Sequence, residues 1–577
     1  MCALLTACFR CGTRIGGVGD GWAAAARWSG NLMFGQTERA ARRRDGLDPP
    51  PRRIGWRPVA VIAAVVIGLA GLTWLALALL HHSPSGTSAS GGASAPGAAP
   101  QAGPKAPPVR VCANGAILGR GPSSPPQGAV RVPAGVNSGI DWSQPNTTYW
   151  FAPGTHFLGP GQFTQIEPGA GARFIGAPGA VLDGRHSNLY AFTGSAANVT
   201  ISYLTIRNFG KRGGNGNEGV VNHDSAPGWT IDHSTLTRNA GAGTMLGSNN
   251  TLSYDCLKDN QQYGFNAFSE AGPAHLVLDH NEIVGNNTYN WEKHVKGCGC
   301  TGGGKFWDVN GAVITDNWVH GNHSVGLWAD TNNRGFEVVG NYIEGNESTG
   351  LIYEISYNAL IAHNTFARNG LVDGPTNPGF PTSAIYVSES GSDGRVPGRY
   401  SGTFSITENT FVNNWGGVVL WENADRFCGS PANTSSGDCT LINSRKITVK
   451  SCNTANIGRP LFYNECRWKT QNVLVAHNVF DFNPTEIGPA CTAMNSCGFQ
   501  GLFSQYGSYP SWSPYKGSVV ENHITFKQNN RFISNTYNGP WRFMVHQQGN
   551  DVSWPTWRSK PYGQDKGSVM NHGGLGY

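Results

Sequence analysis

Two acidic residues occur at the same place in neighbouring copies of a short repeat. Gly326-Leu-Trp-Ala-Asp330 is followed 24 residues later by Gly350-Leu-Ile-Tyr-Glu354. A pair of carboxylates can cleave a glycosidic bond, with one group as general acid and the other as nucleophile or general base. Carboxylate oxygens can also bind Ca²⁺. The repeat therefore indicates a chemical site, provided that the fold places the two acids side by side.

A recurrent Asn sets the register of the repeats. It stands between two short stretches of alternating apolar residues, at positions 281, 317, 341, 364, 409 and 478. The intervals 317 to 341 and 341 to 364 are too short for a propeller blade, and the Leu-x-x-Leu-x-Leu pattern of leucine-rich repeats is absent. Asn suits tight corners because it tolerates left-handed backbone angles. Short strands with Asn corners predict a β-solenoid, in which stacking of the coils creates the core.

The pattern continues in FIGAPGAVLDG (174–184) and ANVTISYLTIRNF (197–209). Over roughly residues 145–540 the chain resembles the right-handed parallel β-helix repeat proteins of the pectate-lyase-like superfamily. The phrases LWENADRFCGSPANTSSGDC (420–439) and YGQDKGS (562–568) resemble parts of exported bacterial β-helix proteins that are thought to act on polysaccharides. The resemblance implies an all-β fold. It names no activity, since this fold carries lyases, hydrolases, epimerases and adhesins, and neither the polygalacturonase motif series nor the pectate-lyase Arg motif is present.

The Asn register predicts a row of acids on one face of the solenoid. An acid follows Asn317, Asn341 and Asn409 by 13 residues, and two further coils fit if a loop is inserted before the strand; the five acids are Asp308, Asp330, Glu354, Glu389 and Glu422. Strand alternation turns Trp328 and Asp330 outward. Acids on stacked strands lie about 4.8 Å apart, so at least one pKa should rise unless a cation or Lys intervenes.

Aromatic residues beside these acids predict a sugar-binding groove, because pyranose rings stack on aromatic side chains. The predicted catalytic residues are Asp330, Glu354, Asp308 and Lys305; the predicted substrate-binding residues are Trp328, Trp307, Glu389, Trp421, Glu422 and His320. His320 could assist as an auxiliary acid or base. Strict alternation points Lys305 inward, so a catalytic role requires an irregular strand end.

Three functions fit this row. The first is a glycoside hydrolase with paired carboxylates. The second is a Ca²⁺-dependent polysaccharide lyase, as the resemblance implies, with Asp308, Asp330 and Glu354 as metal ligands and Lys305 as the base. The third, from another class, is a non-catalytic glycan-binding or cell-envelope interaction protein.

The rest of the chain predicts a membrane-tethered, extracellular domain. Residues 59–80 contain no charge and could span about 30 Å as a single helix. Arg residues precede this segment, so residues 1–58 should be a poorly structured cytoplasmic tail. Residues 81–110 should be a flexible linker, and residues 111–577 an extracytoplasmic, monomeric β-helix domain with an N-terminal cap and a C-terminal tail. Because the excess of Lys and Arg lies before residue 60, the net charge of +6 does not indicate nucleic-acid binding.

Ten cysteines follow the predicted membrane segment, and an even number in an exported domain indicates disulfides. Short loops predict the pairs Cys428–Cys439, Cys452–Cys466 and Cys491–Cys497, although connectivity cannot be read from sequence.

Overall fold

The computed structural model describes residues 106–571 except 270, 296–298, 378–379, 423–446, 454, 457–458, 467–468, 504–518 and 547. The predicted cytoplasmic tail, the membrane segment 59–80 and almost all of the linker lie outside this part of the chain. Among the described residues, no helix is long and apolar enough to cross a bilayer.

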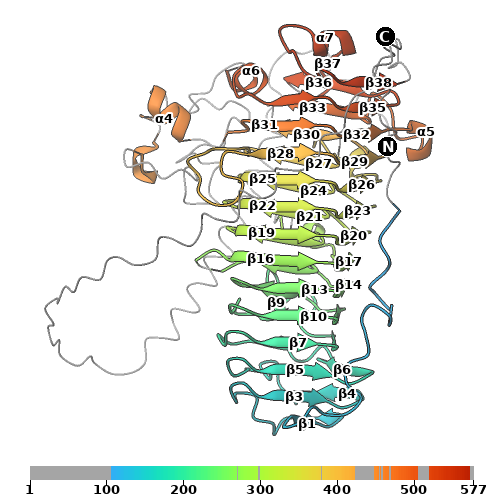
Figure 1. Cartoon of the computed structure of the whole chain (residues 1–577), viewed down its shortest axis with the longest axis vertical. Coiled ribbons are helices and arrows are strands. Elements are labelled where there is room, and N and C mark those ends of the chain that lie inside the picture. Colours follow the sequence, from blue (N-terminus) through green and yellow to red (C-terminus); the bar gives the residue numbers. More distant parts are fainter. Residues whose placement is uncertain are drawn as a thin grey trace, which may run out of the picture. The chain divides into compact units, whose positions relative to one another are not determined.

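Three parallel sheets form the body of the described chain, and the strands of successive coils stack in register (Figure 1). Sheet A contains β1 (Val130–Val132), β3 (Thr148–Phe151), β5 (Arg173–Gly176), β7 (Thr200–Ser202), β10 (Thr230–Asp232), β13 (Thr251–Ser253), β16 (Ala274–Asp279), β19 (Asn310–Thr315), β22 (Arg334–Val339), β25 (Tyr357–Ala362), β28 (Phe404–Thr407), β31 (Val473–Ala476) and β34 (Arg531–Ile533). Sheet B contains β2 (Gly135–Val136), β4 (Gly154–Phe157), β6 (Ala180–Asp183), β8 (Thr205–Arg207), β11 (Thr235–Thr237), β14 (Cys256–Lys258), β17 (Glu282–Val284), β20 (Trp318–His320), β23 (Tyr342–Glu344), β26 (Thr365–Ala367), β29 (Thr410–Val412), β32 (Val479–Asp481), β35 (Thr536–Asn538) and β38 (Val569–Asn571).

Sheet C completes each coil from β9 onward. It contains β9 (Gly219–Val221), β12 (Ala242–Leu246), β15 (Phe265–Ala267), β18 (Gly304–Trp307), β21 (Leu327–Asp330), β24 (Leu351–Glu354), β27 (Ile385–Ser388), β30 (Val418–Trp421), β33 (Phe499–Phe503), β36 (Arg542–His546) and the antiparallel β37 (Asp551–Val552). The helical segments are short: α2 (Trp291–His294), α3 (Asp373–Thr376), η1 (Val449–Ser451), α4 (Pro460–Glu465), α5 (Pro484–Ile487), α6 (Val519–Phe526) and α7 (Trp554–Arg558). The sequence prediction of an all-β solenoid is therefore confirmed for this part of the chain.

Two ladders of buried Asn side chains hold the coils together. In the first, the Nδ2 of each Asn donates to the Oδ1 of the next at 2.9–3.2 Å, through residues 281, 317, 341, 364, 409, 478 and 535. The second runs in the same way at 2.9–3.0 Å through residues 239, 260, 286, 322, 346, 369 and 414. The recurrent Asn in the sequence is thus a structural hydrogen-bond ladder, because each side chain satisfies buried polar groups of adjacent coils.

The glycine that opens each copy of the repeat also has a structural cause. A Cβ on Gly326 would lie 2.5 Å from the carbonyl oxygen of Gly350 and 2.9 Å from the Nδ2 of Asn346 in the second ladder. Gly303 stands in the same relation to the carbonyl oxygen of Gly326, also at 2.5 Å. Only Gly fits where the backbones approach this closely.

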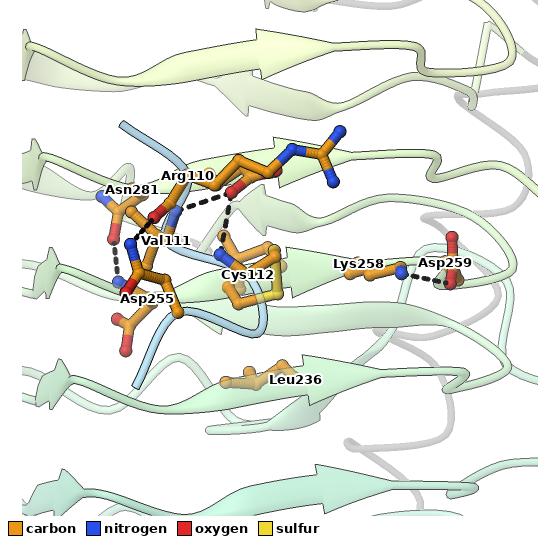
Figure 2. The surroundings of a disulfide bond; sticks show 12 residues. Arg110, Val111, Cys112, Leu236, Asp255, Lys258, Asp259 and Asn281 are labelled. Atoms are coloured by element: carbon orange, nitrogen blue, oxygen red, sulfur yellow. Dashed lines mark hydrogen bonds and ion pairs between the residues drawn. A yellow bond between two sulfur atoms is a disulfide. The ribbon is translucent and has the colours of Figure 1, made fainter. Parts of the chain in front are cut away.

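The described N-terminal segment lies along sheet B (Figure 1). The backbone N–H groups of Val111 and Cys112 donate to Oε2 of Glu282 at 2.7 and 2.8 Å, and Cys112 forms a disulfide with Cys256 in β14 (Figure 2). Farther along, Trp150 Nε1 donates to the carbonyl oxygen of Pro122 at 3.0 Å. We call residues 110–122, which run beside the coils (Figure 1), the strap.

The predicted short-range disulfides Cys452–Cys466 and Cys491–Cys497 are present. The predicted pair Cys428–Cys439 lies outside the described residues. Cys112–Cys256 joins residues 144 positions apart and was not predicted, because its loop length gives no local signal.

Candidate functional site

The outer face of sheet C carries the candidate site in two columns of side chains. The residues between these columns, such as Leu327, Ala329 and Tyr353, belong to the interior core. In strand register, the first column is Lys305, Trp328, Ile352, Tyr386 and Val419, and the second is Trp307, Asp330, Glu354, Ser388 and Trp421. The predicted outward direction of Trp328 and Asp330 is therefore confirmed, and their neighbours in adjacent coils form a second apolar cluster outside the core.

The predicted row of five acids is wrong at three positions. Trp307, not Asp308, pairs with Asp330, and Ser388, not Glu389, pairs with Glu354. Asp308 and Glu389 each come directly after the end of a strand. Their backbone φ angles, 55° and 46°, are left-handed, as is that of Thr331 after β21. They sit in the turn after the strand, so the row among the described residues contains only Asp330 and Glu354.

The third error, at Glu422, comes from a shorter turn. Gly417 follows Asn414 by three positions, whereas the equivalent Gly326 follows Asn322 by four. Trp421 therefore occupies the column, and Glu422 lies beyond the strand.

Both displaced glutamates have structural partners. Glu422 Oε2 accepts from the Thr470 N–H at 3.1 Å and from Gln528 Nε2 at 2.6 Å. Glu389 accepts a short hydrogen bond from the Ser388 hydroxyl. Neither side chain belongs to the candidate site.

Lys305 points outward, contrary to the alternation assumed from sequence. Three consecutive glycines precede it, and the strand is shifted by one residue, so that Lys305 pairs with Trp328. Its Nζ lies 2.9 Å from Asp330 Oδ2, donates to the carbonyl oxygen of Gly299 at 2.6 Å, and is 4.3 and 5.4 Å from the ring centres of Trp328 and Trp307. These contacts all stabilise a positive charge.

Asp330 and Glu354 are direct neighbours on adjacent parallel strands. Besides the ion pair with Lys305, Asp330 Oδ1 accepts from the Thr331 hydroxyl at 2.9 Å. Glu354 Oε2 accepts from Trp328 Nε1 at 3.2 Å. A lysine therefore balances the charge of Asp330, and an indole N–H donates to Glu354; Lys305 is the intervening cation on which the predicted repulsion between the acids was conditional.

The site is closed rather than an open groove. Lys305, Asp330 and Glu354 are only 6%, 9% and 3% exposed. Phe380, from the segment inserted between β26 and β27, packs 5.0 Å from Tyr386 and 6.4 Å from Trp421, measured between ring centres. The acids were expected to be exposed, and they are instead buried.

His320 lies on a different face. It is in β20 of sheet B, stacks on Trp318 at 4.0 Å, and its Nε2 is 3.0 Å from Glu282 Oε1. Burial acts to raise the pKa of Glu282, but the hydrogen bonds from His320 and from the Cys112 and Val111 N–H groups outweigh it, so this pKa is lowered. His320 therefore supports the anchor of the strap and does not contact the acidic pair.

The proposed Ca²⁺ ligands do not converge, since Asp308 lies outside the row. Within the described residues, only one group of three His, Cys, Asp or Glu side chains has its donor atoms within 4.8 Å of one another. It consists of Asp279 at the end of β16, His280 in the turn that follows, and Asp316 in the turn after β19.

Sequence reasoning missed three neighbours of the pair. Tyr386 and Phe380 belong to the cluster with Trp328, and the position of Tyr386 in AIYVS could have shown its equivalence to Trp328. Tyr263 is fully buried, and its pKa is raised, first by burial and then by the charges of Asp330 and Glu292. It precedes its strand and gives no repeat signal.

Comparison with known proteins places the fold. The family model described as "right handed beta helix region" matches residues 221–396 and, in a second match, residues 294–427. No curated protein matches the chain.

Several solved structures are similar. The A-module of the Azotobacter vinelandii mannuronan C-5 epimerase AlgE4 has a TM-score of 0.39 and 14% identity, and the alignment covers 66% of this chain and 90% of that chain. The A-module of AlgE6 from the same organism has a TM-score of 0.41 and 12% identity, with 77% of this chain and 91% of that chain covered. The surface adhesin PfbA of Streptococcus pneumoniae has a TM-score of 0.25 and 11% identity, with 51% of this chain and 77% of that chain covered. At these scores the similarities do not indicate a shared activity. The three parallel sheets show a parallel β-helix across the described chain, and the stretch 221–427 matches the right-handed β-helix family model.

Proposed function

We propose that this β-helix protein acts on a polysaccharide at the outer face of sheet C, with Asp330 and Glu354 as the paired carboxylates of a glycoside hydrolase. The observation that supports this most directly is their in-register position on adjacent strands, between Trp328, Trp307 and Lys305. Adjacent parallel strands lie about 4.8 Å apart, close to the roughly 5–5.5 Å between the carboxyl groups of retaining glycosidases. The pair therefore fits a retaining mechanism better than an inverting one.

The contacts suggest a division of roles. The ammonium of Lys305, 2.9 Å from Asp330, balances a negative charge on that carboxylate, which suits a nucleophile. Glu354 is buried and accepts from the indole N–H of Trp328, which suits the group that exchanges a proton with the leaving oxygen. Because both acids are buried, substrate entry requires the side chains that cover them to move, as lids do in many enzymes.

The lyase alternative gains less support. Lys305 faces the site, as a base would, but its ion pair, its hydrogen bond to Gly299 and the aromatic faces all stabilise the ammonium, which cannot accept a proton. The non-catalytic alternative rests on the burial of both acids, since a closed ion pair can be purely structural.

The test uses a panel of neutral and uronate-containing polysaccharides and measures release of reducing sugars. Glu354→Gln and Asp330→Asn should each abolish release. Glu344→Gln, on β23 of the same coil but in sheet B, is the matched control and should leave the activity unchanged. Ultraviolet absorbance of an unsaturated uronate product, lost on chelation, would instead establish the lyase. Binding of a glycan without cleavage by the unaltered protein would favour the non-catalytic class.

A further inference from the structure

A hollow of about 570 Å³ lies on the outer face of sheet A. Its floor consists of Ser405, Leu474 and Arg531, which occupy one column on β28, β31 and β34. The acidic pair lies on sheet C, so this hollow belongs to a different face of the coils.

The wall of the hollow is a built structure. It is formed by Ser392, Asp393 and Gly394, in the segment between β27 and β28. Asn358 fixes this segment, because its Oδ1 accepts from the Asp393 N–H at 3.0 Å and its Nδ2 donates to the Asp393 carbonyl oxygen at 3.3 Å.

Amide side chains form the end of the hollow. Gln471 Nε2 and Asn472 Nδ2 both donate to the Ser392 carbonyl oxygen, at 3.3 and 3.1 Å, and Asn529 Nδ2 donates to Asn472 Oδ1 at 3.0 Å. These bonds tie the end of the hollow to its wall. Amide and hydroxyl groups of this kind are the usual partners of sugar hydroxyls, because each can donate and accept.

Two charged residues line the hollow, Asp393 and Arg531. Arg395 binds Asp393 through its Nε and Nη2, at 3.1 and 2.8 Å from the two carboxylate oxygens, and these bonds lower the pKa of Asp393 against the effect of burial. Asp393 is therefore already ion-paired, although Arg395 also binds Glu465 Oε1 through its Nη1 at 2.8 Å. Arg531 is exposed, and within the described part of the chain its guanidinium makes no hydrogen bond or ion pair. A guanidinium without a partner, beside sugar-compatible amides, favours a carboxylate-bearing ligand.

We propose that this hollow binds a segment of uronate-containing polysaccharide, with Arg531 contacting a sugar carboxylate and Gln471, Asn472 and Asn529 contacting hydroxyl groups. The site holds the polymer on a face separate from the acidic pair. Binding at this site does not depend on cleavage of the polymer. The proposal goes beyond the hydrolase activity because it assigns a second polysaccharide-binding surface and a negative charge to the polymer.

The chain offers a matched control for Arg531. Following the strand register of sheet A from β34 back to β5 leads to Arg173, an exposed residue of the same column at the other end of the sheet. Arg531→Gln and Arg173→Gln therefore remove the same charge from equivalent positions, inside and outside the hollow.

The experiment is calorimetric titration of the full-length protein with oligogalacturonate and with a neutral cello-oligosaccharide of equal length. The uronate should bind more tightly than the neutral sugar, and Arg531→Gln should weaken uronate binding about tenfold or more, because a hydrogen bond to a charged group contributes about 1.5–3 kcal/mol. Arg173→Gln should change it less than twofold. Ser405→Tyr, which fills the floor without changing charge, should also abolish binding.

Repeating the titration with Glu354→Gln separates this proposal from the hydrolase. If the hollow is the site, Glu354→Gln binds as the unaltered protein does, even where no cleavage is found with any substrate. Equal weakening by Arg531→Gln and Arg173→Gln, equal binding of neutral and acidic sugars, or no binding by the unaltered protein would each overturn the proposal.

Discussion

Replacing Asp255 with Asn should stabilise the protein, and by more at higher pH. Asp255 occupies a position of the first Asn ladder: its Oδ1 accepts from the Ser234 N–H at 2.8 Å and its own N–H donates to Asn281 Oδ1 at 2.9 Å (Figure 2). Its Oδ2 is buried and, within the described residues, has no hydrogen-bond partner. In the next coil the equivalent atom is the Nδ2 of Asn281, which donates to the Leu252 carbonyl oxygen and to Asn317.

The magnitude follows from proton linkage. Burial raises the pKa of Asp255 well above its ordinary value, so the folded protein keeps a proton that the unfolded chain releases. The contribution of this carboxyl to stability is therefore fully present below about pH 4 and falls by at most about 1.4 kcal/mol for each pH unit above it, until the folded carboxyl also ionises. Asn does not ionise, so the gain from Asp255→Asn relative to wild type should grow with each pH unit above pH 4 for as long as the folded carboxyl keeps its proton.

Urea unfolding midpoints, measured for both proteins at several pH values, provide the assay. Asp259→Asn is the control, because Asp259 lies in the following turn with a side chain 39% exposed, beside Lys258. This control should show no gain that grows with pH. The reasoning is refuted if Asp255→Asn is less stable than wild type throughout, or if its effect does not change with pH.

Three further predictions concern the disulfide, the repeat glycine and the ion pair. Replacing Cys112 and Cys256 by Ala should lower the free energy of unfolding by about 5 kcal/mol in denaturant titration, because the bond closes a loop of 144 positions; a loss below 2 kcal/mol would contradict the entropic account. Gly326→Ala should cost about 1–3 kcal/mol in the same assay, since its Cβ would meet backbone at 2.5 Å; an unchanged midpoint would show that the coils can move apart. Lys305→Met should lower the free energy of unfolding by about 3–5 kcal/mol, because it leaves the Asp330 carboxylate buried without its cation. Adding Asp330→Asn should recover much of this loss. A loss below about 1 kcal/mol would mean that the site is open to water in solution.

The repeat could be predicted from the sequence because the same hydrogen bonds recur from coil to coil. Each Asn of the first ladder satisfies backbone groups one coil away, so the same residue must recur at each corner. The in-register pair of Asp330 and Glu354 could be predicted for the same reason, since their two coils have equal turn lengths.

The remaining errors arose where turn lengths change. The count of 13 residues from Asn fails at Glu422, because one turn is a residue shorter. The alignment of the coil with an inserted loop fails at Asp308, because the glycines before Lys305 hide where the strand begins. A one-residue shift moves a side chain to the other face of a strand or into the turn. Burial of the acids could not be read from the pattern either, because the repeat does not show which side chains cover the strands.

The Cys112–Cys256 bond also decides how the molecule carries tension. A pull transmitted from residue 106 toward the C-terminus passes from Cys112 directly into β14 through the disulfide, so the 143 residues from 113 to 255 bear none of it. Those residues would otherwise extend by about 500 Å. The strands from β1 to β13 are therefore shielded from load, and the first coils exposed to it are those that begin at β14 and lead to the acidic pair.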